Sequence, residues 1–279
     1  MSAHANPDAL VSTQYLADHL GDTSIAIVEV DEDTSAYEKG HIPGAVSLDW
    51  ETELHAAPRR DFVSGDALAA LLGGKGVGDG TAIVLYGGNN NWFAAYAFWL
   101  CRYRGIDNVT LLDGGRAKWD LEGRPFTQDW TRRDPATLSR GADRPELRAF
   151  RDDAIRVADA GGQLVDVRAP AEFSGELMAP AHLPQEQAQV PGHIPGALNV
   201  PWSKAANEDG TFRGVDDLRA LYGTLDADQP VTAYCRIGER SAHTWFALTQ
   251  LLGYTDVRNY DGSWTEYGSL VGVPVEVGS

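Results

Sequence analysis

The sequence contains two copies of one pattern, and this duplication constrains the fold more than any other feature. The segments Gly40–Ala45 and Gly192–Ala197 both read GHIPGA and lie 152 residues apart. Three further pairs of segments match along the two halves: 27–31 with 164–168, 84–87 with 232–235, and 113–115 with 261–263. A repeat of this length is a duplicated domain rather than a solenoid unit. The sequence therefore predicts two domains that share one fold.

Each half alternates short apolar segments with helical patterns, which is typical of an α/β domain with a mostly parallel sheet. We expect strands near 25–30, 45–48, 81–86, 109–112, 163–167, 197–200, 231–234 and 256–259. We expect helices near 64–73, 91–104, 115–121, 152–159, 214–223 and 241–252. The prediction is thus an α/β fold of tandem duplicated domains, each a mostly parallel sheet flanked by helices. The first domain covers 1–123, a linker rich in Pro, Arg, Asp and Thr covers 124–148, and the second domain covers 149–279.

The charge of the chain excludes some partners. There are 40 acidic and 23 basic residues, a formal net charge of −17, which argues against a nucleic acid or an anionic membrane as partner. A small anionic substrate stays possible, because salt screens charges beyond about 8 Å. The two cysteines, Cys101 and Cys235, cannot form a disulfide framework. The first 20 residues lack the features of a secretion signal, so we expect a cytoplasmic protein.

The loop Cys235–Ser241 carries the strongest chemical signal. It follows the apolar segment 231–234 and precedes a helical pattern, so its amides and the helix N-terminus should form an anion-binding bowl. Such surroundings lower a thiol pKa from about 8.5 to roughly 3.5–7.5. We therefore expect Cys235 to be a catalytic nucleophile that is largely thiolate near neutral pH. Besides Cys235 and two arginines, this active-site loop contains Ile237, Gly238, Glu239 and Ser241.

Two arginines in this loop are candidates for binding the substrate. Arg240 and Arg236 carry permanent charge, and guanidinium groups suit planar oxyanions. Arg240, at the start of the helix, is expected to turn back over Cys235, whereas Arg236 is expected to point outward. Glu239 opposes anion binding unless it pairs with Arg236 or faces solvent, and the sequence leaves these alternatives open. The competing interpretation is a buried structural cysteine beside solvated arginines.

The first half has no equivalent nucleophile. Gly87 stands where the second half has Cys235, and the residues after it are uncharged through Trp92. We therefore expect an inactive first domain. A phosphate-binding loop here lacks the lysine and serine of a P-loop. Cys101 lies in an almost entirely apolar helical segment and is expected to be inert core.

The duplicated GHIPGA segments, the cysteine loop, the segment Leu164–Arg168 and the turn Asp261–Trp264 together resemble the two-domain rhodanese family of sulfurtransferases. The resemblance covers nearly the whole chain and implies that Cys235 carries the transferred sulfur as a persulfide. It implies thiosulfate as donor, release of sulfite, and a thiophilic acceptor such as cyanide. Arg240 and Arg236 would orient the sulfonate of this small anionic donor. No metal or organic cofactor is implied.

Alternatives differ from this resemblance in their loops. Mercaptopyruvate sulfurtransferases typically have Cys-Gly-Ser/Ala-Gly-Val-Thr, with fewer charges. A cysteine phosphatase of rhodanese-like fold needs an arginine six positions after the cysteine, where this chain has Ser241. A non-catalytic sulfur-relay or sensor module remains open. Two features depart from relatives in the rhodanese family. Ile237 stands two positions after the cysteine, where the vertebrate thiosulfate branch has a lysine, and Glu172-Phe173 stands where some relatives have a substrate-binding arginine.

The second half contains 15 additional residues within 175–190, between the strand that ends at Arg168 and the GHIPGA segment. Long connections in α/β domains commonly carry function. We expect this insertion to fold over the catalytic side and to shape the cleft.

Overall fold

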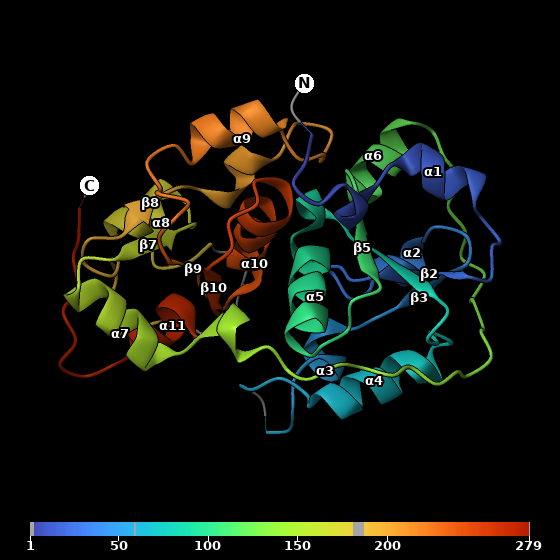
Figure 1. Ribbon diagram of the computed structural model, residues 1–279, viewed down its shortest axis with the longest axis horizontal. Coiled ribbons are helices and arrows are strands. Elements are labelled where there is room, and N and C mark those ends of the chain that lie inside the picture. The colour runs from blue at the N-terminus through green and yellow to red at the C-terminus, as the bar shows by residue number, and fades with distance from the viewer. Residues whose placement is uncertain (1–2, 59, 181–186, 279) are drawn as a thin grey trace. The chain divides into compact units, whose positions relative to one another are not determined.

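The computed structural model describes residues 3–58, 60–180 and 187–278. Within these ranges the chain forms two compact units (Figure 1). One unit contains Pro7–Arg144 and Ala206–Phe212, and the other contains the remaining described residues. Over the same ranges each unit has one five-stranded sheet with all its strands parallel. This confirms the predicted α/β fold with two similar domains.

The first unit has the sheet order β1-β5-β4-β2-β3. Its strands are β1 (Leu10–Val11), β2 (Ile25–Glu29), β3 (Ala45–Ser47), β4 (Ala82–Tyr86) and β5 (Val109–Leu112). Its helices are α1 (Thr13–Asp18), α2 (Ala36–Lys39), α3 (Trp50–Glu53), α4 (Gly65–Gly74), α5 (Trp92–Tyr103) and α6 (Gly115–Leu121). Short 3₁₀ turns lie at η1 (Pro7–Ala9) and η2 (Asn89–Asn91).

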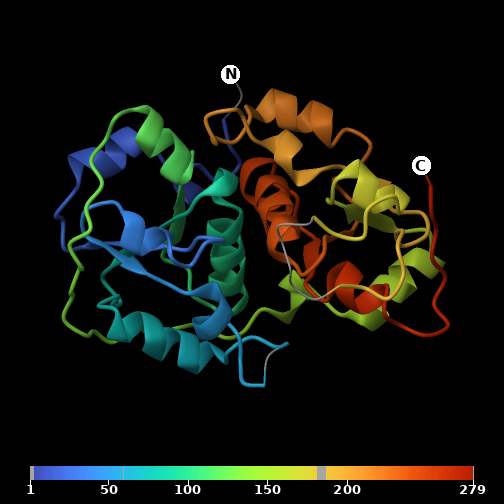
Figure 2. The same ribbon diagram turned by 180° about the vertical axis from the view of Figure 1, so that it is seen from behind.

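Alternate residues of the central strands pack on opposite faces of this sheet. Ile27 of β2 belongs to a core with Leu16 of α1 and Trp119 of α6. The helix α5 lies along the other face (Figures 1 and 2). Because both faces are covered, the central strands are mostly apolar, which is usual for parallel sheets.

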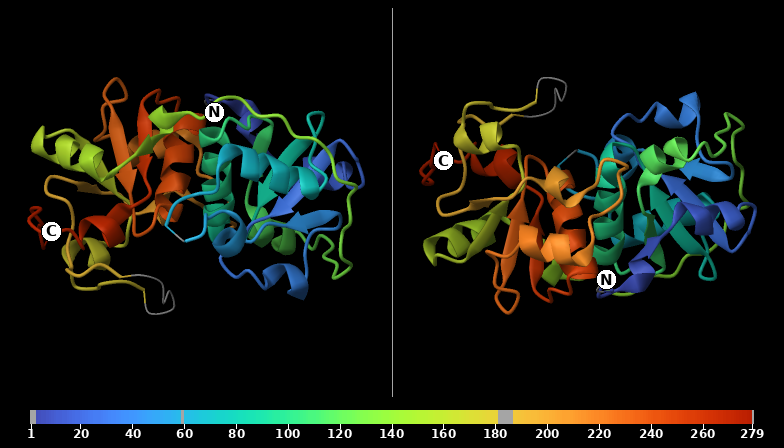
Figure 3. Two further views of the ribbon diagram at one scale, coloured as in Figure 1. Left: turned by 90° about the horizontal axis from the view of Figure 1, so that it is seen from below. Right: turned by 90° about the horizontal axis from the view of Figure 1, so that it is seen from above.

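The second unit repeats this order as β6-β10-β9-β7-β8. Its strands are β6 (Arg148–Ala149), β7 (Gln163–Asp166), β8 (Leu198–Asn199), β9 (Val231–Tyr234) and β10 (Val257–Tyr260). Its helices are α7 (Arg151–Asp159), α8 (Pro170–Ser174), α9 (Val215–Leu221), α10 (Glu239–Phe246) and α11 (Ser263–Tyr267). Two 3₁₀ turns lie at η3 (Pro145–Leu147) and η4 (Trp202–Ala205), and α10 continues into a π-helical turn, η5 (Ala247–Leu251). Figure 3 shows α7 and α11 on one face of this sheet and α10 on the other.

Several short elements were not predicted. The strands β1 and β6 have two residues each, too few for a periodic pattern, and they form by pairing with β5 and β10.

Helix α10 begins at Glu239, two residues before the predicted start at Ser241. This difference matters, because it places Glu239 and Arg240 within the first turn of the helix.

The expected linker is not a free connection over its first part, because residues 124–144 belong to the first unit. Arg133 donates hydrogen bonds to the carbonyls of Ile25 and Thr23, at 2.8 and 2.7 Å. Arg144 forms a two-pronged ion pair with Asp107, with both contacts at 2.6 Å. These arginines bind the first part of the predicted linker segment to the first unit.

Residues 181–186, in the middle of the predicted insertion, lie outside the described residues. Just after them, the amides of Gln189 and Val190 both donate to the carbonyl of Gly268, at 3.2 and 3.1 Å. Within the described residues, every helix is too short or too polar to cross a membrane.

Candidate active site

Cys235 directly follows β9, which lies in the centre of the second sheet between β10 and β7. Carboxyl ends of parallel strands are where α/β sheets bind ligands. The loop turns into α10 at Gly238, whose φ of +98° favours glycine. A Cβ atom at Gly238 would also lie 2.7 Å from Asp261 Cα, so the turn has no room for a side chain. Sequence and packing together therefore place the cysteine at the N-terminus of a helix, as predicted.

The Cys235 sulfur is enclosed by its own loop. The residue is fully buried, and the amide of Gly238 donates to Sγ at 3.1 Å. The thiol in turn donates to Oε2 of Glu239 at 3.3 Å. The backbone amide of Cys235 donates to Oγ of Ser263, at 3.0 Å. These contacts hold the sulfur over the first turn of α10.

The sequence predicted a lowered pKa for the Cys235 thiol, and the surroundings of the sulfur contradict that prediction. Burial raises the pKa of the Cys235 thiol, and the adjacent Glu239 carboxylate raises it further, while Arg240 opposes this. The prediction counted the helix N-terminus and the two arginines but not the removal of the sulfur from water. Both the raised pKa and the contact with the Glu239 carboxylate favour the thiol form of Cys235 over the thiolate.

Glu239 does not face solvent, which was one of the two orientations that the sequence left open, and its charge acts on Arg236, which was the partner in the other. It is buried, with 1% of its surface exposed, and its Oε1 lies 3.6 Å from Nε of Arg240. Its other carboxylate oxygen faces the Cys235 sulfur. A carboxylate therefore lines the bowl in which an anion was expected to bind.

Arg240 is bound by an acidic side chain from another element. Its two terminal nitrogens donate to the two carboxylate oxygens of Glu172 on α8, at 2.8 and 3.0 Å. Burial would raise the pKa of Glu172, but the hydrogen bond and charge of Arg240 outweigh it and lower the pKa overall. The Nε of Arg240 is buried and has no hydrogen-bond partner among the described residues. The residue is thus partly neutralised by Glu172 and retains one buried donor close to Glu239.

Arg236 was expected to point outward into solvent, and the structure shows that it is buried instead. It is 2% exposed, and its carbonyl accepts a hydrogen bond from the amide of Thr265 at 3.1 Å. Burial lowers the pKa of its guanidinium, and the charge of Glu239 opposes this. Both loop arginines are therefore inside the protein.

The remaining loop residues shape the turn. Ser241 Oγ lies 2.6 Å from Oδ1 of Asn259, and Nδ2 of Asn259 donates to the carbonyl of Gly238 at 3.0 Å. Ile237 is the partly exposed residue of the segment between Cys235 and Ser241. The polar residues thus fix the backbone of the loop, and Ile237 is its side chain nearest to solvent.

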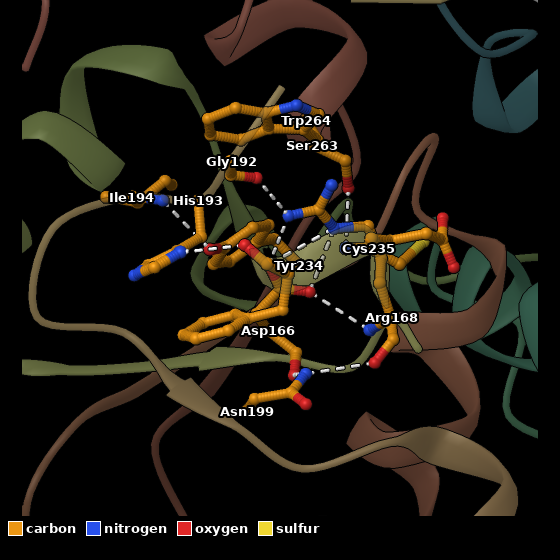
Figure 4. A network of polar contacts seen from close by, with 12 residues as sticks. Asp166, Arg168, Gly192, His193, Ile194, Asn199, Tyr234, Cys235, Ser263 and Trp264 are labelled. Carbon is orange, nitrogen blue, oxygen red and sulfur yellow. Dashed lines mark hydrogen bonds and ion pairs between the residues drawn. The ribbon is translucent and has the colours of Figure 1, made fainter. Parts of the chain in front are cut away.

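A polar network that the sequence did not reveal supports the strand that leads to the cysteine (Figure 4). Arg168 pairs with Asp166 through two nitrogens, donates to the carbonyl of Gly192 at 2.7 Å and lies 4.9 Å from the ring centre of Trp264. The hydroxyl of Tyr234, the residue before Cys235, accepts the amide of Ile194 at 3.1 Å. The signal for this network was the strand sequence Leu164–Arg168, with an acid and an arginine two residues apart.

The equivalent loop of the first unit is closed by its own side chains. The amide of Gly87 donates to Oδ1 of Asn91 at 2.9 Å, and Nδ2 of Asn91 donates to the carbonyl of Leu112 at 2.6 Å. A Cβ atom at Gly87 would lie 2.2 Å from the carbonyl oxygen of Val30. This backbone cannot hold a cysteine side chain without moving. The other thiol of this unit, Cys101, is buried in α5, and burial raises its pKa to about 12.

Two copies of one parallel α/β fold, with a buried cysteine in the strand-to-helix loop of the second copy, define a duplicated α/β protein with a candidate site in its second copy. The family model for the rhodanese-like domain matches residues 12–122 and 151–270. The chain belongs to the rhodanese family, and it is a sulfurtransferase with tandem rhodanese domains. This confirms the resemblance and the enzyme class predicted from the sequence.

Three similar proteins cover almost the whole chain. A "Putative thiosulfate sulfurtransferase" of Saccharopolyspora erythraea is 56% identical and covers 96% of both chains. Another of that name, from Mycolicibacterium smegmatis, is 55% identical and covers 99% of this chain and 100% of its own. The "Sulfur carrier protein TtuD" of Thermus thermophilus is 48% identical and covers 99% of both.

Solved structures with the same fold include the crystal structure of YnjE. It has a TM-score of 0.81 and 26% identity, and the match covers all of this chain and 70% of that chain. The anaerobic ergothioneine biosynthesis enzyme from Chlorobium limicola, in complex with trimethyl histidine, has a TM-score of 0.85. It shares 23% identity, with coverage of 100% and 72%, so this likeness concerns the fold alone.

Proposed function

We propose that this sulfurtransferase takes the outer sulfur of thiosulfate onto Cys235 and passes it to a thiophilic acceptor. The main support for this proposal is the position of Cys235 Sγ, which lies 3.1 Å from the amide nitrogen of Gly238 at the start of α10. A helix N-terminus stabilises an anionic sulfur, both as thiolate and as persulfide. Covalent transfer in two steps follows from this arrangement.

In the first step the Cys235 thiolate attacks the outer sulfur of thiosulfate. A new S–S bond forms to Cys235, the S–S bond of thiosulfate breaks, and its electron pair leaves on sulfite. In the second step the acceptor, for example cyanide, attacks the outer persulfide sulfur, so that thiocyanate leaves and the Cys235 thiolate returns. The electrons balance between donor and acceptor, so no external oxidant or reductant is needed.

The donor site is proposed to use both loop arginines. Arg240 has a buried Nε without a hydrogen-bond partner in the described part of the chain, and such a donor is satisfied by an anionic oxygen. Arg236, also buried, adds a second positive charge to the same loop. Glu172 and Glu239 reduce the net charge of the site, so we expect it to favour a small anion that carries several acceptor oxygens.

Two related functions remain to be separated from this one. 3-Mercaptopyruvate is the alternative donor, although two arginines in the loop favour a sulfonate over a carboxylate. A sulfur-relay role is favoured by the relative from Thermus thermophilus, which is described as a sulfur carrier protein. In that case the persulfide on Cys235 would be consumed by a protein acceptor.

Steady-state kinetics of the purified protein test the proposal. Thiosulfate and 3-mercaptopyruvate are compared as donors with cyanide as acceptor, and mass spectrometry locates the added sulfur. We expect ping-pong kinetics, a higher kcat/KM for thiosulfate, and one added sulfur on Cys235. Faster turnover with 3-mercaptopyruvate would reassign the donor. Rapid persulfide formation with slow turnover to cyanide would favour the relay function.

A further inference from the structure

The side chains of Cys235 and Glu239 form a buried pair within the loop. Sγ of Cys235 and Oε2 of Glu239 are 3.3 Å apart. Cys235 is 0% exposed and Glu239 is 1% exposed. The residues are four positions apart, across the turn that begins α10. The thiol proton therefore points at a carboxylate oxygen rather than at solvent.

The contacts of the sulfur leave few routes for this proton. Besides Glu239, the Gly238 amide donates a hydrogen bond to Sγ, and the amide and hydroxyl of Ser241 also act on the thiol as hydrogen-bond donors. The two amides cannot accept a proton, and the Ser241 hydroxyl directs its own hydrogen bonds to the Gly238 carbonyl and to Asn259. His243, one turn further along α10, has its ring in edge contact with Trp202, with the centres 5.2 Å apart. Glu239 is the acceptor that the geometry offers.

Two arginines and a second carboxylate surround the pair. Arg240 contributes a positive charge 3.6 Å from Oε1 of Glu239, and Arg236 also acts on Glu239. Glu172 faces Arg240 from α8 and takes up much of its charge. A thiolate and a carboxylate in contact would repel each other, and each would oppose an incoming anion. One shared proton removes one of the two negative charges.

We propose that Glu239 is a catalytic residue that accepts the Cys235 proton as thiosulfate is attacked. The S–H bond breaks, its electron pair stays on sulfur, and the proton bonds to Oε2. The thiolate then forms the new S–S bond, and sulfite leaves with the electron pair of the old one. Neutral Glu239 can donate its proton as a hydrogen bond to the persulfide, and it returns the proton when the acceptor releases the thiolate.

This role rests on the proposed sulfurtransferase chemistry and explains how a buried thiol can serve it. Burial and Glu239 raise the pKa of Cys235, so few molecules lose this proton to water near neutral pH. An internal transfer makes the reactive form independent of pH as long as the pair holds one proton. The wild-type protein should therefore show a flat profile of kcat/KM against pH around neutrality.

The variant Glu239→Gln tests this inference, because an amide of the same shape cannot accept the proton. Loss of the carboxylate charge alone would lower the pKa of Cys235 and speed the reaction at pH 7. A fall in kcat/KM for thiosulfate on the order of 100-fold, which we expect, therefore reports the loss of the proton acceptor. The kcat/KM of the variant should then rise about tenfold per pH unit towards alkaline pH, as the thiol ionises to water. Glu146→Gln, an exposed residue of η3, is the matched control for the loss of one negative charge and should behave like wild type.

Alkylation of Cys235 by iodoacetamide gives a readout that does not require sulfur transfer. The wild-type rate should be nearly independent of pH around neutrality, and the Glu239→Gln rate should rise with pH. Glu239→Asp keeps a carboxylate and should retain the flat profile at a lower rate. It also serves as the second test if the glutamine variant does not fold.

The outcomes separate this inference from the proposed function. Equal or faster turnover of Glu239→Gln at pH 7, or the same pH slope in wild type and variant, would overturn the role of Glu239. If wild-type Cys235 gains no sulfur from thiosulfate, the proposed donor fails. The alkylation profiles still decide whether the pair shares a proton.

Discussion

Removal of Glu172 should destabilise the second unit strongly, because it leaves the Arg240 charge buried and unpaired. Both side chains are almost completely buried, with 0% and 4% of their surface exposed, and two hydrogen bonds of 2.8 and 3.0 Å join them. Hydrogen bonds to charged groups contribute about 1.5–3 kcal/mol each. Loss of one partner from a buried pair costs about 3–5 kcal/mol. Glu172→Ala also removes the hydrogen bond from the Ala169 amide that caps α8.

We therefore expect Glu172→Ala to lower the free energy of unfolding by about 3–5 kcal/mol, and Arg240→Ala to lower it by a similar amount. The double variant should lose far less than the sum of the two, since no charge is left without its partner. Urea unfolding, followed by circular dichroism and tryptophan fluorescence together, measures these values and tests whether the transition has two states.

A surface pair provides the control for this cycle. Arg219 and Asp216 on α9 are 58% and 70% exposed and 3.4 Å apart, so Arg219→Ala should change the stability by less than about 1 kcal/mol. Additive losses for Glu172→Ala and Arg240→Ala, within about 0.5 kcal/mol, would refute the argument. They would mean that each side chain is stabilised by other groups.

The remaining predictions concern the thiols, the arginines and pH. Cys235→Ser should abolish sulfur transfer while Cys101→Ser leaves kcat/KM nearly unchanged, and an added sulfur found on Cys101 would contradict the assignment. Arg240→Ala should reduce kcat/KM for thiosulfate more than Arg236→Ala, with a loss of about 1.5–3 kcal/mol of transition-state stabilisation. Arg240→Lys should recover only part of this loss, because an ammonium group keeps the charge but cannot form two parallel hydrogen bonds. A larger loss in Arg236→Ala would assign donor binding to Arg236. Since the pKa of Glu172 is lowered in the folded protein, its contribution is present above the ordinary glutamate pKa and is lost as pH falls through the lowered value. The stability difference between wild type and Glu172→Gln should thus shrink in acid, and a difference that stays constant across that range would show that the carboxylate charge is not the cause.

The sequence by itself determined the duplication, the parallel sheets and the position of the cysteine. These features depend on local patterns: apolar segments of strand length, helical periodicity, and a loop that needs glycine at Gly238. The sequence also predicted that the first domain lacks a nucleophile, because the repeat aligns Gly87 with Cys235. Strands of two residues, such as β1, could not be predicted, because they exist only through pairing with a neighbour.

The tertiary structure decided the electrostatics of the site. Glu172 and Arg240 are 68 residues apart in the chain, and their pairing became visible only when α8 and α10 were placed together. The orientation of Glu239 towards Cys235 likewise depends on the whole surrounding core. Motifs describe which charges are near a thiol, but its pKa also depends on how completely water is removed. That removal is a collective result of every segment that packs over the sulfur, and no short stretch of sequence contains it.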